Sequence, residues 1–175
     1  MSIPVSEDGA PLRGALDSST AIILYKSGLL ESFCAEWDLI TTDAVYEEIS
    51  QGISGKEISC ILKSSSDSDA VSIEGLFGKG ENSVLNLYRE GKAGIIFSDD
   101  GRFLEYCKKE GIPHYSSIMV PYLLFNIGKM SKDKGLEYTS IIITKGRFSE
   151  WVLDYVKSLW EKKISHRDTE NTEKG

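Results

Sequence analysis

Acidic side chains stand where the sequence predicts strands to end and helices to begin. These acids are Asp17, Glu48, Glu81, Asp99 and Asp100. Asp17 directly follows the apolar stretch 14–16, and the pair Asp99 and Asp100 directly follows the apolar stretch 95–97. Both stretches are short and continuous, as is typical of strands covered on both faces in a parallel sheet. Because the carboxyl ends of parallel strands border a common crevice, we expect these acids to lie in one pocket.

A pocket of carboxylates predicts a site for divalent metal. Carboxylates gathered without Lys or Arg between them repel one another, so the arrangement is costly unless cations occupy it. Hard oxygen ligands select Mg²⁺ or Mn²⁺. The candidate metal ligands are Asp17, Glu81, Asp99 and Asp100, and the candidate catalytic set is Asp17, Glu48, Glu81 and Asp100.

Such a site can hydrolyse phosphodiester bonds with metal-activated water and needs no side-chain nucleophile. The chain has only two histidines, one of them in the final stretch, so a histidine general base has little support. Ser18 and Ser98 each neighbour one of the acids and are candidates for hydrogen bonds that orient the carboxylates. Asp99 could replace or assist Asp100, because both follow the same strand.

Each acid also has a purely structural interpretation. Asp17 precedes Ser-Ser-Thr and could cap a helix. Glu81 in a first helical turn would complement the helix dipole, and Asp99-Asp100 could begin a turn. The order and context of the acids in combination favour the functional interpretation.

Strands and helices alternate along the chain, which predicts an α/β domain, namely a three-layer α/β/α fold with a short-stranded, mainly parallel sheet. Strands are expected at 14–16, 39–41, 70–73, 95–97 and 114–115. Helices are expected at about 21–25, with N-cap oxygens from 18–20, and at 43–49, 57–63, 81–90, 102–109, 117–127 and 149–162. A single domain over 14–163 would follow a poorly ordered leader, 1–13, and precede a disordered polar tail, 164–175.

Composition limits the function classes. The chain of 175 residues can bury one core, and its formal charge of -7 argues against a general basic coat for nucleic acid. A carboxylate site neutralised by metal remains compatible with a phosphate backbone. No apolar run approaches the roughly 20 residues that span a bilayer, so we expect a cytoplasmic protein without membrane contact. Three cysteines without C-x-x-C spacing suggest neither a disulfide framework nor a zinc site.

At its acidic residues the chain resembles the PIN-domain family, in particular a prokaryotic VapC-like branch. The segment 16–19, Leu-Asp-Ser-Ser, is similar to the family's opening strand with its Asp-Ser/Thr signature. The segment VYEEI at 45–49 is similar to the family's V-x-x-E-[IL] element, which places the second acid at Glu48 rather than Glu47.

Two later segments carry the same resemblance in the family's order. Gly80-Glu81 resembles the Gly-Glu that begins the next helix, and FSDDGRF at 97–103 is similar to T-x-D-x-x-F, which maps the acid to Asp100. The segment Tyr-Ser-Ser at 115–117 departs from the Gly-Thr or Gly-Ser of many members, so a polar contact there is an open question. The resemblance covers about residues 14–120.

The resemblance implies a ribonuclease that uses Mg²⁺ or Mn²⁺ and acts on RNA. It also implies a possible toxin role with a small antitoxin whose tail blocks the pocket, and a homodimer. Weak candidates for substrate contact are Arg102, after the strand-end acids, and Lys129 and Lys132 in an expected loop between two helices.

Two other functions compete. The first is a PIN-like scaffold for RNA or protein that has lost catalysis or retains it weakly, which the acidic net charge favours. The second is a phosphoryl-transfer domain of the haloacid-dehalogenase or receiver type. It does not fit, because Ser19 stands where the dehalogenase motif needs its second Asp, and because Asp99-Asp100 follows Asp17 where a receiver needs its acidic pair first.

Overall fold

A five-stranded parallel sheet, ordered β3-β2-β1-β4-β5, forms the centre of the computed structural model, which describes residues 2–65, 67–69 and 76–170. The strands are β1 (Gly14–Leu16), β2 (Leu39–Thr42), β3 (Asp67–Asp69), β4 (Ile95–Phe97) and β5 (His114–Tyr115). In the register, Ala15 of β1 pairs with Ile40 on one side and Ile96 on the other. Strands β1, β2 and β4 are buried along their whole length, which explains their continuous apolar sequence.

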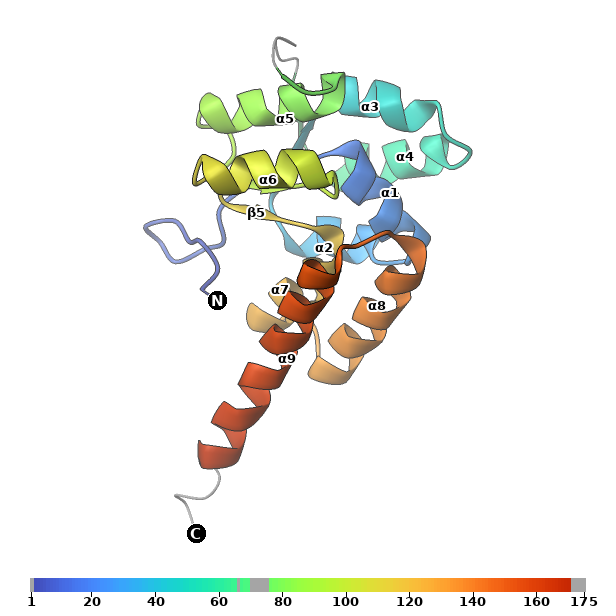
Figure 1. Cartoon of the computed structure of the whole chain (residues 1–175). Coiled ribbons are helices and arrows are strands. Elements are labelled where there is room, and N and C mark those ends of the chain that lie inside the picture. Colours follow the sequence, from blue (N-terminus) through green and yellow to red (C-terminus); the bar gives the residue numbers. More distant parts are fainter. Residues whose placement is uncertain (1, 66, 70–75, 171–175) are drawn as a thin grey trace.

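Helices cover the sheet in the predicted α/β/α arrangement. They are α1 (Ser18–Lys26), α2 (Leu30–Glu36), α3 (Asp43–Ser50), α4 (Gly55–Ser65), α5 (Lys79–Arg89), α6 (Gly101–Lys109), α7 (Val120–Asn126), α8 (Lys132–Lys145) and α9 (Glu150–Glu170), with a 3-10 turn at Ser117–Met119. Helix α5 packs across β1, β2 and β4, while α3 and α4 contact β2 and β3. Figure 1 shows α5 and α6 side by side in the upper half, with α7, α8 and α9 below. Among the described residues, no helix is both long and apolar enough to span a membrane.

Aromatic rings fill the centre of the core. Phe97 of β4 makes edge contacts with Phe33 and Trp37, whose ring centroids lie 5.1 and 5.6 Å away. Gly14 faces the same ring, and a Cβ on Gly14 would overlap the Phe97 side chain. The first strand therefore needs a glycine at its start.

Two predicted segments differ from the observed elements. Helix α8 occupies residues where the sequence predicts only a loop between helices, and Lys132 is its first residue. The strand between α4 and α5 is Asp67–Asp69, whereas the predicted strand at 70–73 lies outside the described residues.

The chain ends also depart from the sequence expectations. Within the predicted leader, Val5 and Pro11 form an antiparallel bridge, and Leu12 packs against the core. Helix α9 continues to Glu170, beyond the predicted end at 162, while 171–175 lie outside the described residues. Glu, Lys and Arg are good helix formers, so a polar composition does not by itself end a helix.

Candidate active site

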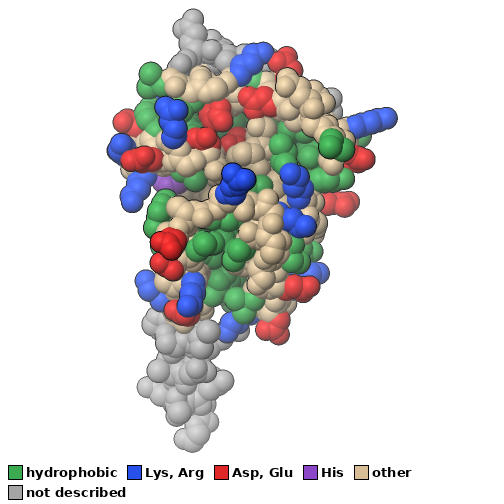
Figure 2. All heavy atoms as spheres, turned by 45° about the vertical axis from the view of Figure 1, so that its right-hand side comes forward, with side chains coloured by type: hydrophobic (Ala, Val, Ile, Leu, Met, Phe, Trp, Pro, Cys, Tyr) green, Lys and Arg blue, Asp and Glu red, His purple; other side chains and the backbone are tan. Residues whose placement is uncertain are grey.

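The predicted acids gather at the carboxyl ends of the strands. Asp17 directly follows β1, Asp100 begins α6 after β4, and Glu48 lies on the helix that follows β2. All strands run parallel, so these chain positions share one edge of the sheet. Figure 2 shows Asp and Glu side chains close together on the upper part of one face, in the half of the molecule where Figure 1 places α3 and α5.

Asp17 is the innermost acid, with 1% of its surface exposed. Its Oδ1 accepts hydrogen bonds from the Thr20 N–H at 2.9 Å and the Ser19 hydroxyl at 2.8 Å. Its Oδ2 accepts from the hydroxyls of Ser98 and Ser19. Burial raises the pKa of Asp17 to about 7 in spite of these bonds, and the neighbouring Asp99 charge adds to the rise.

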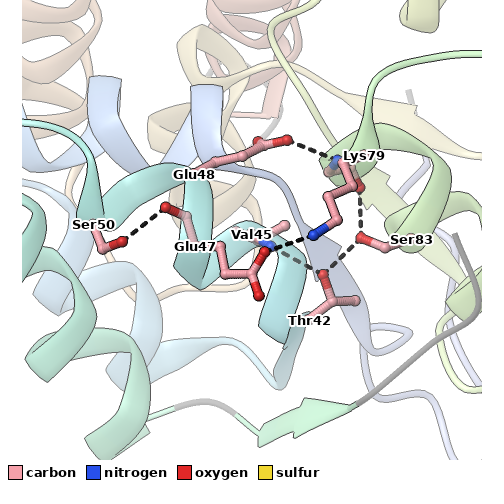
Figure 3. A network of polar contacts seen from close by, with 8 residues as sticks. Thr42, Val45, Glu47, Glu48, Ser50, Lys79 and Ser83 are labelled. Carbon is pink, nitrogen blue, oxygen red and sulfur yellow. Dashed lines mark hydrogen bonds and ion pairs between the residues drawn. The ribbon is translucent and has the colours of Figure 1, made fainter.

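Glu48 is fixed at both carboxylate oxygens. Its Oε2 accepts from the Ser18 hydroxyl at 2.6 Å, and its Oε1 accepts from the Gly80 N–H at 2.8 Å. The neighbouring Glu47 instead pairs with Lys79 at 2.7 Å on the surface. Figure 3 shows the two glutamates leaving α3 in different directions. The structure therefore directs Glu48, and not Glu47, toward the gathered acids.

Glu81 and Asp100 face one shallow hollow of about 260 Å³. Its lining consists of Leu76, Phe77, Gly78, Glu81, Asp100 and Arg102. Burial raises the pKa of Glu81, and the charges of Glu48 and Asp100 raise it further. Glu81 therefore lies close enough to Glu48 and to Asp100 for their charges to act on it.

Serine hydroxyls link Asp17 to the backbone of Asp100 and hold Glu48 beside the residue that follows Asp17. The Ser98 hydroxyl donates to Asp17 and accepts from the Asp100 N–H at 3.1 Å. Ser18, next to Asp17 in the chain, donates to Glu48. Asp17, Glu48, Glu81 and Asp100, with Ser18 and Ser98, are called the acidic network below.

Asp99 points elsewhere, although it adjoins Asp100. Its Oδ1 accepts from the Ser117 N–H at 2.9 Å, and it lines a different hollow beside α9. Burial raises the pKa of Asp99 to about 6, and its bonds and the nearby hydroxyls of Thr20 and Ser116 partly offset the rise. Of the two alternatives at this strand end, Asp100 is the one that shares a hollow with Glu81.

The structural interpretations of the acids also hold. Asp17 and Asp100 are the N-cap residues of α1 and α6, and Asp100 Oδ1 accepts from the Phe103 N–H at 2.8 Å. Asp17, and not the following Ser-Ser-Thr, is therefore the cap of α1. Glu81 lies in the first turn of α5. Capping fixes each carboxylate at the start of a helix, so it positions the acids rather than excluding a functional role.

The donor chemistry of the acidic network fits a hard divalent cation. Glu81 and Asp100 offer carboxylate oxygens to the hollow, and no described hydrogen bond engages Asp100 Oδ2. None of the ion pairs recorded for the described residues involves an acid of the network. The same part of the chain contains no group of three or more His, Cys, Asp or Glu side chains already arranged around a metal position. A cation would therefore draw on Glu81 and Asp100 first, with Asp17 enclosed behind them.

The three predicted substrate contacts separate in space. Arg102 lines the hollow of Glu81 and Asp100. Lys129 forms an ion pair with Glu36 of α2 at 3.1 Å, and Lys132 lines a hollow between α8 and α9. Only Arg102 of the three adjoins the acidic network.

No protein-family model matches the sequence, and no curated protein matches it. A solved structure described as the PIN domain endonuclease Utp24 has a similar arrangement of elements, with a TM-score of 0.49 and 15% sequence identity. The similarity covers 59% of this chain and 84% of that chain. The function proposed next rests on the geometry of the acidic network.

Proposed function

We propose that this protein is a metal-dependent nuclease that hydrolyses phosphodiester bonds of RNA. The observation that carries the proposal is the acidic network, in which burial, and after it the charges of Glu48 and Asp100, raise the pKa of Glu81 beside the hollow that it shares with Asp100. Like charges held together by the fold cost stability, which a bound cation would restore.

The burial and hydrogen bonds of each residue indicate a separate role for it in the reaction. Glu81 and Asp100 would hold Mg²⁺ or Mn²⁺ at the hollow, and a bound ion of this kind activates water and stabilises the leaving oxygen. The buried Asp17 would add negative charge to the site. Its hydrogen bond with Ser98, which in turn accepts from the Asp100 N–H, fixes the backbone at Asp100. Glu48, held by Ser18 and Gly80, would keep its carboxylate in a fixed position beside the start of α5. Arg102 would contact a substrate phosphate.

The choice of RNA follows the resemblance of segments 16–19 and 97–103 to PIN-domain motifs. The same resemblance supports a toxin role with a small antitoxin and a homodimer. These remain predictions, as does the cytoplasmic location expected from the lack of a long apolar run. A neighbouring reading frame that encodes a small antitoxin-like protein would support the toxin role over a housekeeping one.

Cleavage of single-stranded RNA tests the proposal. The wild type should cut in Mg²⁺ or Mn²⁺ and stop in chelator, and Asp100→Asn should lower the rate by orders of magnitude. His114→Ala should change it little, because the His114 Nδ1 atom contacts the backbone oxygen of Ile112, two residues earlier in the chain. Cleavage that persists in chelator, or that survives Asp100→Asn, would refute the mechanism.

A catalytically weak scaffold is the second candidate, and one observation favours it. Asp17 is almost fully enclosed and has hydrogen bonds at both oxygens, so a ligand could reach it only if the network rearranged. RNA binding without cleavage across several substrates and both metals would support the scaffold.

A further inference from the structure

A second functional surface adjoins the acidic network on the far side of Asp99. Two hollows of about 430 and 730 Å³ lie between α6, the end of β5 and α9. Both are lined by Leu104, Lys108, Ser116, Trp151 and Val152. We call this continuous surface the α6–α9 groove. Its size is in the range of pockets that hold small organic groups.

The groove presents an aromatic ring beside a cation. Trp151 has 60% of its surface exposed, although tryptophan usually buries most of its area. The Lys108 ammonium lies 5.6 Å from the centre of the Trp151 ring. An exposed ring offers a stacking surface to a planar base, and a nearby ammonium attracts the phosphate that accompanies it.

Polar atoms in the groove lack hydrogen-bond partners. Ser116 is 5% exposed and lines both hollows, yet its hydroxyl makes no hydrogen bond of proper geometry with the described residues. Asp99 lines the upper hollow, and its buried Oδ2 is likewise without a partner in the described part of the chain. The Ser116 hydroxyl lies close enough to Asp99 to lower the pKa of its carboxyl, so the two groups form one polar patch at the side of the groove.

The groove begins where the acidic network ends. Gly101 lines the upper hollow and directly follows Asp100, which faces the network. Lys108 lines both hollows, whereas Asp99 and Glu105 line the upper hollow and Asp154 lines the other. A phosphate would therefore approach the groove on the side of Lys108.

We propose that the α6–α9 groove binds a nucleobase of single-stranded RNA next to the phosphodiester bond that the acidic network cuts. The proposal rests on the nuclease function above and adds a base-binding subsite to it. Trp151 stacks on the base, and Lys108 neutralises the adjacent phosphate.

Tryptophan fluorescence can report on base binding at this site. Trp37 and Trp160 are 3% and 4% exposed, so a base that stacks on a tryptophan from solvent meets Trp151 at 60% exposure. We would titrate Asp100→Asn, in Mg²⁺ so that the RNA stays intact, with octamers of adenosine or uridine. The adenosine octamer should quench the emission, and added Trp151→Ala should weaken its binding about tenfold. Trp151→Phe should restore most of that loss.

Matched variants distinguish RNA binding in the groove from nonspecific attraction of RNA to positive side chains. Lys108→Ala should weaken RNA binding, whereas Lys134→Ala should not, although Lys134 also lies over an aromatic ring, 5.9 Å from the centre of Tyr138. Trp151 is largely exposed, so an unchanged melting temperature would confirm that Trp151→Ala folds.

The outcomes distinguish the two proposals. RNA that binds Trp151→Ala as tightly as the parent, or binds without quenching, would overturn the base-binding groove even where the wild type cleaves RNA. Quenching that depends on Trp151, together with no cleavage by the wild type in either metal, would support the groove and overturn the nuclease function.

Discussion

Gly80 leaves open the space that the Glu48 carboxylate occupies. The Gly80 N–H donates to Glu48 Oε1 at 2.8 Å, and a Cβ on Gly80 would overlap both oxygens of that carboxylate. The start of α5 therefore sets the position of an acid that α3 carries.

Gly80→Ala should displace Glu48 and impair catalysis more than folding. A displaced catalytic group can lower the reaction rate by up to about a hundredfold. The stability change should be small, because alanine exceeds glycine in helix propensity by about 1 kcal/mol and offsets part of the strain. Cleavage rate and melting temperature of the same preparation would measure both.

Gly101→Ala is the matched control, since Gly101 is also at a helix start and a Cβ there would meet nothing within 4 Å. It should retain near wild-type cleavage at saturating RNA, and only that rate serves as the control, because Gly101 also lines the α6–α9 groove. Equal losses in the two variants would show that the fit of Glu48 against Gly80 is unimportant.

Local pattern is enough to predict the strands that two of the acids follow. The apolar stretches 14–16 and 95–97 identify buried strands, and parallel strands bring Asp17 and Asp100 to one edge. The sequence pattern could not show which of Asp99 and Asp100 faces Glu81. The direction of Asp99 depends on a hydrogen bond from the Ser117 N–H, which the fold places beside it after β5.

Helix α8 shows what local pattern misses. Its buried residues are Gly135, Thr139 and Ile142, so its inner face has helical spacing but only one large apolar side chain. A Cβ on Gly135 would overlap the Trp160 ring, so this glycine serves a contact with α9. Such a contact between distant segments leaves no periodic signal in the sequence.

Local pattern also fails to indicate a functional role for Trp151, for a related reason. The apolar register of α9 includes Val152, Val156 and Leu159, and Trp151 lies outside it. An aromatic residue off the buried register is the signal that would have indicated an exposed ring.

The stability of the metal-free protein should fall as pH rises from about 4 to about 7. Folding raises the pKa of Asp17 from 3.8 to about 7, so in this window the unfolded chain binds fewer protons than the folded one. Asp99, with its pKa raised to about 6, acts in the same direction. Since a pKa difference of one corresponds to about 1.4 kcal/mol, the Asp17 contribution is at most about 4 kcal/mol.

Denaturant unfolding in chelator across this pH range would measure the effect. Asp17→Asn removes the titrating group and should flatten the profile, whereas Ser98→Ala removes a bond that lowers the pKa of Asp17 and should extend the fall to higher pH. A profile for Asp17→Asn that is as steep as wild type would assign the dependence to other groups.

Mg²⁺ or Mn²⁺ should raise the melting temperature at neutral pH, because a cation relieves the repulsion at Glu81. A ligand at about 100 times its Kd stabilises the folded state by about 2.7 kcal/mol. For a chain of this size that is roughly 5–10 °C. Glu81→Gln should remove most of the gain, while Glu47→Gln should keep it, since Glu47 pairs with Lys79 away from the hollow. Identical gains in both variants would place the ions elsewhere.

Arg102→Ala should weaken RNA binding several-fold, and Lys129→Ala and Lys132→Ala should leave it unchanged. Arg102 lines the hollow of Glu81 and Asp100, whereas Lys129 pairs with Glu36 and Lys132 lies between α8 and α9. Loss of one phosphate contact lowers the slope of log affinity against log salt by about 0.7 for a single strand. Affinities measured by anisotropy at three salt concentrations would give this slope. If the salt slope were unchanged in Arg102→Ala but reduced in Lys129→Ala, the RNA would bind near the end of α7 rather than at the acidic network. That result would contradict the proposed site.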